Sequence, residues 1–257
     1  MSVSTKRCVS VADEALRSQV RQWIAEAPRI AVLTGAGMSA ESGVPTFRDA
    51  LTGLWARFNP EELATETAFR AHPQRVWAWY AHRRAALVQV APNAGHLALA
   101  GFALRHPGRL TLITQNVDDL HQRAGLVDTI ALHGSLLDDR WLDPPRTCCH
   151  IEPIQDGEPP SCPVCGNLRR PSVVWFGESL PSAALAAAEA AAHDCDLMLV
   201  VGTSGVVYPA AGLAFTAHQH GARVAIINPE PSDLDPVADV CLRELAAQSL
   251  PPLLETS

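Results

Sequence analysis

The segment that decides the fold is residues 30–49, which read IAVLTGAGMSAESGVPTFRD. It begins with the apolar run Ile30–Thr34, which has the length and composition of a short buried strand. Gly35-Ala36-Gly37-Met38-Ser39-Ala40 follows at once and has the form G-x-G-x-x-A. Glycines in such a turn let backbone N–H groups approach a pyrophosphate at a helix N-terminus. The segment therefore predicts a dinucleotide-binding turn at the carboxyl end of a strand.

The chain departs from an ordinary dehydrogenase directly after this turn. Gly43 and Pro45 end the helix early, so we expect a long polar loop to lie over the dinucleotide. A dehydrogenase also carries an acidic residue at the end of a second strand, about 20 residues further on. This chain has a helical segment there instead. An NAD(P)-dependent oxidoreductase is therefore an alternative that these residues disfavour.

Apolar runs with the length of strands recur along the chain, with helical stretches between several of them. The expected strands are Ile30–Thr34, Leu110–Thr114, Thr129–Leu132, Leu197–Val201 and Val224–Ile227. The expected helices are 12–26, Ala183–Ala192 and Ala210–His220. Strands that alternate with helices indicate an α/β fold, in which helices cover both faces of a parallel sheet.

Two segments break this alternation and indicate a second, smaller domain. Residues 51–92 look helical with loops, whereas residues 136–171 are rich in Pro and Cys and show little periodicity. We expect these two segments to form a helical insertion and a zinc-ribbon-like module beside a Rossmann-like parallel sheet. The dinucleotide-binding domain would then consist of residues 12–50, 93–135 and 172–257.

Composition and charge limit the class of protein. The chain has 257 residues, of which 47% are hydrophobic, and can bury the core of one large domain with a small module. Its net charge of −7 argues against broad nucleic-acid binding, which needs clustered Lys and Arg. No apolar run approaches the roughly 20 residues of a membrane span, and the first residues lack the apolar stretch of a secretory signal. Four of the seven cysteines lie between Cys148 and Cys165, which indicates a metal cluster in a reducing compartment, so we expect a cytoplasmic protein.

Residues 34–49, TGAGMSAESGVPTFRD, resemble the signature loop of the sirtuins, which are NAD-dependent protein-lysine deacylases. Five further segments match motifs of that family in the family's order: TQNVDDLHQRAG, LHGS, VVWFGE, VVGTSGVVYP and IINPE. The resemblance extends from about Ile30 to Pro251. It implies that NAD is a co-substrate and that the products are free lysine, nicotinamide and an O-acyl-ADP-ribose.

Polar side chains at two strand ends are the candidate catalytic group. Residues 114–118 follow one expected strand and His133 ends the next, so we expect both to face the crevice where ligands bind in parallel sheets. A lone histidine is ordinarily a core or capping residue, but its place beside a second polar strand end favours catalysis. The resemblance implies that Asn116 and Asp118 hold the nicotinamide carboxamide and that Gln115 contacts the ribose. It also implies that His133 is the catalytic base, which accepts a proton from the ribose hydroxyls.

The other cofactor-binding residues are carried over from the family motifs. They are Gly35, Ala36, Gly37, Ser39, Ala40, Ser42, Pro45, Thr46, Phe47, Arg48, Gly202, Thr203, Ser204, Asn228 and Ala246. For Asn228 and Ala246, an ordinary strand-end turn remains an alternative. The segments around Val174, Phe176, Gly177 and Glu178, and around Val206, resemble the family's two peptide-binding edges. An acylated lysine in an extended peptide would pair between them through backbone hydrogen bonds.

Tyr80 and Arg83 are candidates for selecting the acyl group. They are three residues apart on an expected helix and therefore share one face. A guanidinium and a phenol can clamp a terminal carboxylate. The pair matches the Tyr-x-x-Arg signature of sirtuins that prefer succinyl- and malonyl-lysine, with deacetylation as a weaker or parallel activity. The alternative is a solvated basic helix face that includes His82 and Arg84.

The cysteine-rich segment contains half of a zinc site. Cys162 and Cys165 have the spacing of a zinc knuckle. The family pattern places a second pair soon after the histidine motif, where this chain has Arg140-Trp141-Leu142-Asp143-Pro144. Cys148 and Cys149 stand slightly later and complete the expected structural zinc site. Because adjacent cysteines rarely bind one ion together, His150 could replace one of them; the alternative is a loop held by packing without zinc.

Three further alternatives stay open at this point. They are the oxidoreductase described above, a transferase that moves ADP-ribose onto proteins, and a non-enzymatic zinc-containing binding module. The charge balance and the polar strand ends disfavour the last of these. We expect the enzyme to act as a monomer, without nucleic acid or membrane.

Overall fold

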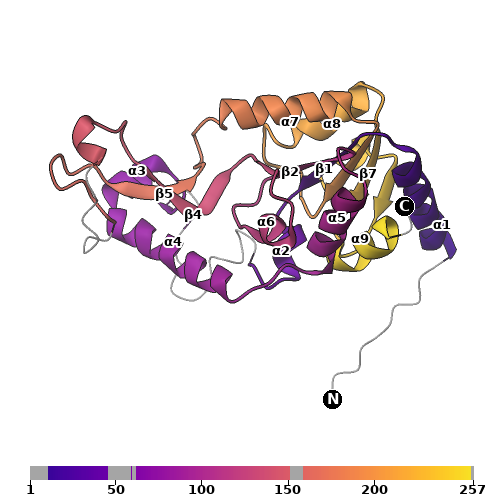
Figure 1. Cartoon of the computed structure of the whole chain (residues 1–257), viewed down its shortest axis with the longest axis horizontal. Helices are drawn as coiled ribbons and strands as arrows, with labels where there is room; N and C mark the ends of the chain where they lie inside the picture. Colours follow the sequence, from indigo (N-terminus) through magenta and orange to yellow (C-terminus); the bar gives the residue numbers. More distant parts are fainter. Residues whose placement is uncertain (1–10, 46–58, 60–61, 151–158, 256–257) are drawn as a thin grey trace, which may run out of the picture.

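A six-stranded parallel sheet and the helices that cover it form the larger of the two parts of the molecule, at the right of Figure 1. In this computed structural model the described residues are 11–45, 59, 62–150 and 159–255. The sheet contains β1 (Ile30–Thr34), β2 (Leu110–Thr114), β3 (Ile130–Ala131), β6 (Leu197–Val201), β7 (Arg223–Ile227) and β8 (Val240–Leu242). Their spatial order is β3-β2-β1-β6-β7-β8. The order reverses between β1 and β6, which is where open α/β sheets bind their ligands.

Both faces of the sheet are buried because its strands are apolar on both sides. In β1, Ile30 and Val32 pack on one face and Ala31 and Leu33 on the other. The first face is covered by α1 (Val11–Glu26), α5 (Ala94–Arg105) and α9 (Ala246–Leu254). The second is covered by α7 (Ser182–Asp194) and α8 (Gly212–Gln219), the orange helices at the top of Figure 1. The predicted Rossmann-like parallel sheet is confirmed.

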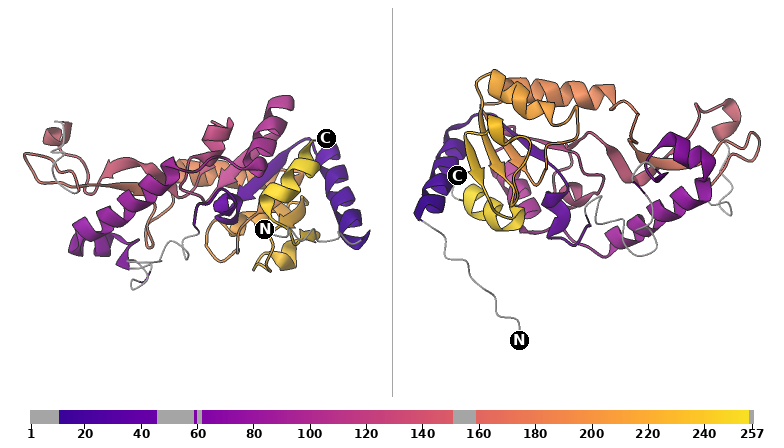
Figure 2. Two further views of the ribbon diagram at one scale, coloured as in Figure 1. Left: turned by 90° about the horizontal axis from the view of Figure 1, so that it is seen from below. Right: turned by 180° about the vertical axis from the view of Figure 1, so that it is seen from behind.

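A smaller unit lies to one side of the sheet, away from α1 and α9 (Figure 2). It consists of α3 (Glu66–Ala71), α4 (Pro73–Val88) and an antiparallel pair, β4 (Gly134–Trp141) and β5 (Arg169–Val173). Its core contains four large aromatic side chains, Phe69, Trp79, Tyr80 and Trp175. The short elements α2 (Gly37–Ala40), α6 (Leu120–Ala124), η3 (Thr147–His150) and η4 (Asp235–Val237) complete the described structure.

The structure corrects the sequence analysis at several elements. The strand expected at Thr129–Leu132 is reduced to the two residues of β3. Residues 136–171, where little periodicity was expected, contain most of β4 and β5. β4 is exposed or half-buried along most of its length, so it lacks an apolar alternation, and the register of the pair shifts between Gly134 and Asp139. The helices α5 and α9 and the strand β8 were not expected.

None of the helices in the described ranges combines the length and the apolarity that a membrane span requires.

Candidate active site

The glycine turn after β1 is packed directly against the end of β6. The backbone N–H of Gly35 donates to Val201 O at 3.0 Å, and that of Gly37 donates to Gly202 O at 2.8 Å. A Cβ added to Gly37 would lie 2.7 Å from Gly202 Cα, and one added to Gly35 would lie 2.7 Å from Thr203 Cβ. The glycines are therefore needed for this close approach of two backbones at the switch point of the sheet.

The side chains that follow β2 are joined to this turn by hydrogen bonds. Asn116 is buried, and its Nδ2 donates to the hydroxyl of buried Ser39 at 3.1 Å. The side-chain Nε2 of Gln115 donates to Thr203 Oγ1 at 3.2 Å. Polar groups from the ends of β1, β2 and β6 thus meet at one place, as the sequence predicts.

His133 is held in one tautomer by the same loop. Its Nδ1 lies 2.8 Å from the carbonyl oxygen of Gln115. A carbonyl only accepts, so Nδ1 carries the hydrogen and Nε2 keeps the lone pair that a base needs. Burial lowers the pKa of His133, and the hydrogen bond to Gln115 opposes that shift. The ring is therefore neutral at neutral pH, with Nε2 able to accept a proton.

Asp118 lies in the same region and is partly buried. Desolvation raises the pKa of its carboxyl, against hydrogen bonds from the Leu120 backbone and from Ser39. Its Oδ1 accepts the Leu120 N–H at 3.1 Å. Ser39 thus contacts both Asn116 and Asp118, the two residues to which the family resemblance assigns the nicotinamide carboxamide.

A chain of buried hydroxyl and imidazole groups lies beneath Asn116 and was not expected from the sequence. Thr114 Oγ1 accepts the Asn116 backbone N–H at 3.0 Å and the Thr34 hydroxyl at 2.8 Å. Because Thr34 gives its hydrogen to Thr114, the 3.1 Å contact from His121 Nε2 must be a donation to Thr34. The His96 ring packs against the His121 ring in a tilted arrangement, with centroids 4.7 Å apart. His121 belongs to the motif that supplied Asn116, and this proximity in sequence was the one available signal.

Each of these two histidines has one buried ring nitrogen that remains to be accounted for: His96 Nε2, which is a donor, and His121 Nδ1, which is an acceptor. His96 Nδ1 accepts the Asn93 N–H, so its Nε2 carries the hydrogen, whereas His121 Nδ1 carries a lone pair. Neither atom has a hydrogen-bond partner among the described residues. Burial lowers the pKa of His96 to about 4 and that of His121 to about 3, so both rings are neutral at neutral pH.

The other described residues expected to bind the dinucleotide lie on or just after the glycine turn, after β6 and β7, and at the start of α9. Ala246 begins α9, and the Glu41 carboxylate after α2 accepts the neighbouring Ala247 N–H at 2.6 Å. Asn228 follows β7 and donates through its side chain to Glu230 O at 2.7 Å. Ala36, Ala40, Ser204 and Pro45 are exposed, and Ser42 is half-buried. Thr46, Phe47 and Arg48 lie outside the described residues.

Tyr80 and Arg83 lie one turn apart on α4, and Tyr80 belongs to the aromatic core of the smaller unit. Tyr80 is buried, and its hydroxyl oxygen accepts the Trp175 Nε1–H at 2.9 Å. The guanidinium carbon of Arg83 lies 4.9 Å from the Trp79 ring centroid and 5.9 Å from that of Tyr80. Desolvation raises the pKa of Tyr80 to about 12, so the phenol keeps its proton. Arg83 is half-buried, and Arg84 turns instead to Leu136 O at 2.7 Å.

The segment 173–178 connects this unit to His133. The N–H of Val174 donates to His133 O at 2.9 Å, and the N–H of Phe176 donates to Ala64 O at 2.9 Å. The side chains of Phe176 and Val206 are 52% and 49% exposed, which makes both available to an incoming chain. Glu178 accepts hydrogen bonds from Arg170, Arg140 and the Trp175 backbone.

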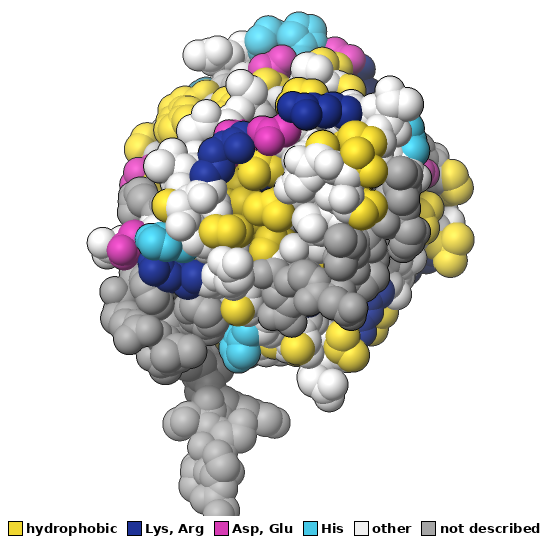
Figure 3. All heavy atoms as spheres, turned by 90° about the vertical axis from the view of Figure 1, so that its left-hand side faces the viewer, with side chains coloured by type: hydrophobic (Ala, Val, Ile, Leu, Met, Phe, Trp, Pro, Cys, Tyr) yellow, Lys and Arg dark blue, Asp and Glu magenta, His cyan; other side chains and the backbone are white. Residues whose placement is uncertain are grey.

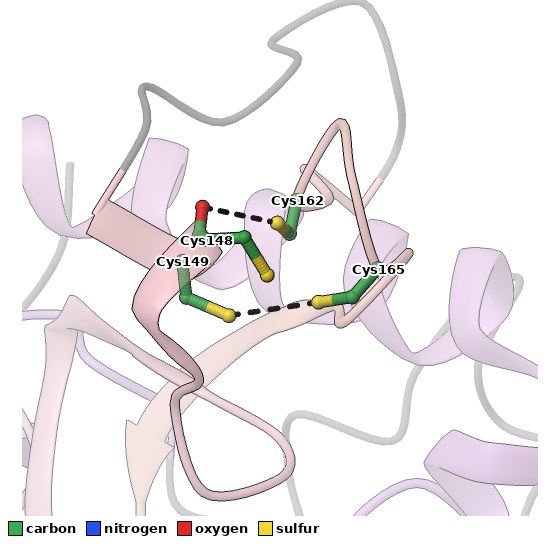
Figure 4. A group of neighbouring side chains, drawn as sticks. All are labelled: Cys148, Cys149, Cys162 and Cys165. Atoms are coloured by element: carbon green, nitrogen blue, oxygen red, sulfur yellow. Dashed lines mark hydrogen bonds between the residues drawn. The ribbon is translucent and has the colours of Figure 1, made fainter.

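The side chains of four cysteines point toward one another and form one cluster (Figure 4). The sulfur atoms of Cys148, Cys149, Cys162 and Cys165 all lie within 4.8 Å of one another. Tetrahedral Zn–S bonds of about 2.3 Å place sulfur atoms about 3.8 Å apart, and Cys149 Sγ lies 3.7 Å from Cys165 Sγ. Both members of the adjacent pair reach the cluster from η3, whereas His150 is exposed. The donor set fits a structural zinc ion.

Comparison with known proteins agrees with this geometry. The model of the Sir2 family matches residues 35–209. A protein of Ralstonia nicotianae named NAD-dependent protein deacylase is 58% identical over 95% of this chain and 98% of its own length. NAD-dependent protein deacylase 1 of Pseudomonas aeruginosa is 49% identical over 91% of this chain and 96% of its own length.

Two solved structures show the same fold. The complex of a Sir2 homologue with NAD is 43% identical and has a TM-score of 0.81, with coverage of 93% of each chain. Sir2 bound to an acetylated peptide is 28% identical and has a TM-score of 0.80, with coverage of 93% of this chain and 97% of the other.

Proposed function

The chain belongs to the Sir2 family and is an NAD-dependent protein deacylase, and from that premise we propose that it removes succinyl and malonyl groups from protein lysines. Deacetylation would be a parallel activity. The observation that carries this proposal is the pairing of Tyr80 and Arg83 on α4, beside an aromatic core.

This pairing supports an acidic acyl group for electrostatic reasons. Arg83 lies among aromatic rings, and desolvation lowers its pKa against the opposing effects of Tyr80 and Asp118. A half-buried cation gains from an anionic partner, and a guanidinium can donate two hydrogen bonds to one carboxylate. Tyr80 keeps its phenolic hydrogen, so it can donate a third. An acetyl group offers no charge to these donors.

The catalytic assignments are part of the same proposal. Bound NAD would supply the ribosyl carbon at which the acyl oxygen of the substrate lysine displaces nicotinamide. His133 accepts a ribose hydroxyl proton at Nε2, because its Nδ1–H is held by Gln115 O. Asn116 and Asp118 hold the nicotinamide carboxamide, and the support is their shared contact with Ser39 beside the glycine turn.

The remaining assignments follow the fold. Gln115 and the glycine turn hold the dinucleotide with the ends of β6, β7 and α9. An extended peptide pairs between the segments that carry Val174 and Val206, and the exposed Phe176 lies on the first of these. The cysteine cluster holds structural zinc, remote from the reaction. The net charge of −7 and the thiol cluster support a cytoplasmic protein that binds no nucleic acid, and we take it to act as a monomer.

The test is a panel of succinylated, malonylated and acetylated peptides with NAD, run on the wild type and two matched variants. Arg83→Met removes the proposed clamp. Arg84→Met removes the same charge from the same helix, but from a side chain that faces Leu136 and Asp139. Charge-assisted hydrogen bonds contribute about 1.5–3 kcal/mol, so Arg83→Met should lower kcat/KM for succinyl peptide by roughly 10- to 100-fold.

The clamp predicts that Arg83→Met changes deacetylation less than about threefold and that Arg84→Met leaves the succinyl-to-acetyl ratio unchanged. Equal losses on both peptides in Arg83→Met would contradict it. Transfer of ADP-ribose to protein without release of deacylated lysine would point to the transferase alternative.

A further inference from the structure

Arg170 is a cation buried in the core of the smaller unit. It lies in β5, and its side chain is only 2% exposed. Its guanidinium carbon lies 3.3 Å from the centroid of the Trp175 ring, which is itself buried. Arginine is almost never fully buried unless its charge is paired. The residue that pairs with the Arg170 charge therefore indicates the role of this side chain.

The partner is Glu178, eight residues along the chain. Arg170 Nη1 donates to Glu178 Oε1, and Nη2 donates to Oε2 at 3.1 Å and to Val173 O at 2.8 Å. Glu178 Oε2 also accepts the Trp175 backbone N–H at 2.8 Å. The ion pair thus closes the segment 170–178 on itself and fixes Trp175 from two sides, by its backbone and by the stacked guanidinium.

Trp175 carries this constraint to the acyl-selecting helix. Its Nε1–H donates to the Tyr80 hydroxyl oxygen at 2.9 Å. A phenol oxygen that accepts one hydrogen bond is a stronger donor of its own hydrogen. The accepted bond also limits the directions in which the Tyr80 hydrogen can point. The orientation of the Trp175 ring therefore decides how Tyr80 presents its hydrogen to a ligand.

The ion pair between Arg170 and Glu178 also borders the surface of the molecule. Arg170 and Glu178 line an outer cleft with a volume of about 600 Å³, together with Arg140, Trp141 and Leu142. Charged side chains lie beside a hydrophobic hollow at this end of the molecule (Figure 3). Arg140 also donates to Glu178, at 2.9 Å, but its side chain is 47% exposed. Two arginines thus bind the same carboxylate, and Arg170 is the one whose guanidinium stacks on the Trp175 ring.

We propose that Arg170 is a positioning residue for acyl selection: stacked on Trp175 and clasped by Glu178, it fixes the indole N–H that orients the Tyr80 hydroxyl toward a carboxylate-bearing acyl group. The proposal rests on the acidic-acyl function proposed above.

A matched pair of lysine variants tests this proposal on the full-length enzyme. Arg170→Lys keeps the charge but cannot both stack as a plane and bind the carboxylate in a fork. Arg140→Lys makes the same change on the exposed partner of the same carboxylate. Arg170→Lys should lower kcat/KM for succinyl peptide by about tenfold, chiefly through KM, with less than a threefold change for acetyl peptide. Arg140→Lys should change both by less than twofold.

A second variant isolates the contact between the indole and the phenol. Trp175→Phe retains a ring beneath Arg170 but removes the Nε1–H. It should show the same selective loss, and the double variant with Arg170→Lys should lose little more than either single variant, because both act through Tyr80. Should Arg170→Lys fail to fold, a cycle of Trp175→Phe with Tyr80→Phe tests the contact through which Arg170 must act: non-additive losses are expected, and additive losses would overturn the proposal.

The outcomes separate this proposal from the function on which it rests. Equal losses on succinyl and acetyl peptides in Arg170→Lys, or fully additive losses in the double variant, would overturn the positioning role. If Arg83→Met still loses desuccinylation selectively in that case, the acyl clamp stands and the role of Arg170 is merely structural. A wild-type enzyme without preference for acidic acyl groups would end both proposals.

Discussion

Replacement of Gly37 by alanine probes the contact that brings the dinucleotide turn to the end of β6. The added Cβ would lie 2.7 Å from Gly202 Cα and 2.9 Å from Gly202 O. Both neighbours are backbone atoms, which cannot rotate away as a side-chain end could. Gly37 does not adopt the left-handed conformation, so the effect of the substitution is steric rather than torsional. The turn and the strand end must separate by about 0.7 Å to reach the 3.4 Å of ordinary contact.

This separation should lower the Tm and raise the KM for NAD, each by a predictable amount. Overpacking of this kind costs about 1–3 kcal/mol, which corresponds to a fall in Tm of about 2–10 °C for a chain of this length. Misplacement of a binding loop by close to 1 Å costs up to about 100-fold in activity, so KM for NAD should rise at least about tenfold. KM for the peptide should change less, because the added Cβ presses first on Gly202 at the dinucleotide turn.

The assay is initial-rate kinetics with NAD varied at saturating acyl peptide, together with thermal unfolding. Gly101→Ala is the control, because its Cβ would meet only the flexible end of Arg105 in α5, at 3.3 Å. That substitution should leave KM unchanged and shift stability by less than about 1 kcal/mol. A Gly37→Ala enzyme with the KM for NAD and the Tm of the wild type would refute the reasoning.

Three further predictions concern His133, the buried histidine pair and the cysteine cluster. Because the pKa of His133 is lowered, kcat/KM should persist below pH 6.5 and fall only as the ring gains a proton; an acid limb with a midpoint above 6.5 would count against it. The pKa values of about 4 for His96 and about 3 for His121 lie below the ordinary value of 6.5. Their contribution to stability is therefore present above pH 6.5 and lost as pH falls toward 4, by up to about 1.4 kcal/mol per pH unit for each ring. The variant His96→Gln/His121→Gln should flatten this part of the curve of unfolding free energy against pH, and an unchanged slope would exclude the pair as its source. Cys149→Ser should lower bound zinc from about one equivalent toward zero and reduce Tm, whereas Cys195→Ser, outside the cluster, should keep the metal; equal zinc in both proteins would argue against the four-sulfur site.

The sequence predicted the parallel sheet and its polar strand ends for physical reasons. Runs such as Leu197–Val201 are buried on both faces, so they are apolar throughout and easily found. A G-x-G turn directly after one such run indicates the strand beside which the strand order of the sheet reverses. Polar residues directly after the next strands could then be expected to meet there, and Gln115 and His133 do so.

The parts that the sequence did not predict depend on contacts between distant segments. From sequence alone Arg170 would be assigned to the surface, because its contacts with Glu178 and Trp175 exist only in the folded chain. The pairing of His96 with His121 arises from the packing of α5 against α6. The sequence also gave no means to decide whether Cys148 and Cys149 reach one metal ion together, because that depends on the short turn η3.

The most direct test of the central claim is the count of nicotinamide released per lysine deacylated, in the wild type and in His133→Ala. We predict one nicotinamide for each acyl group removed, with none released in the absence of acylated peptide. His133→Ala should bind NAD and keep the Tm of the wild type but produce no free lysine. Turnover comparable to that of the wild type in His133→Ala would contradict the assignment of this imidazole as the base.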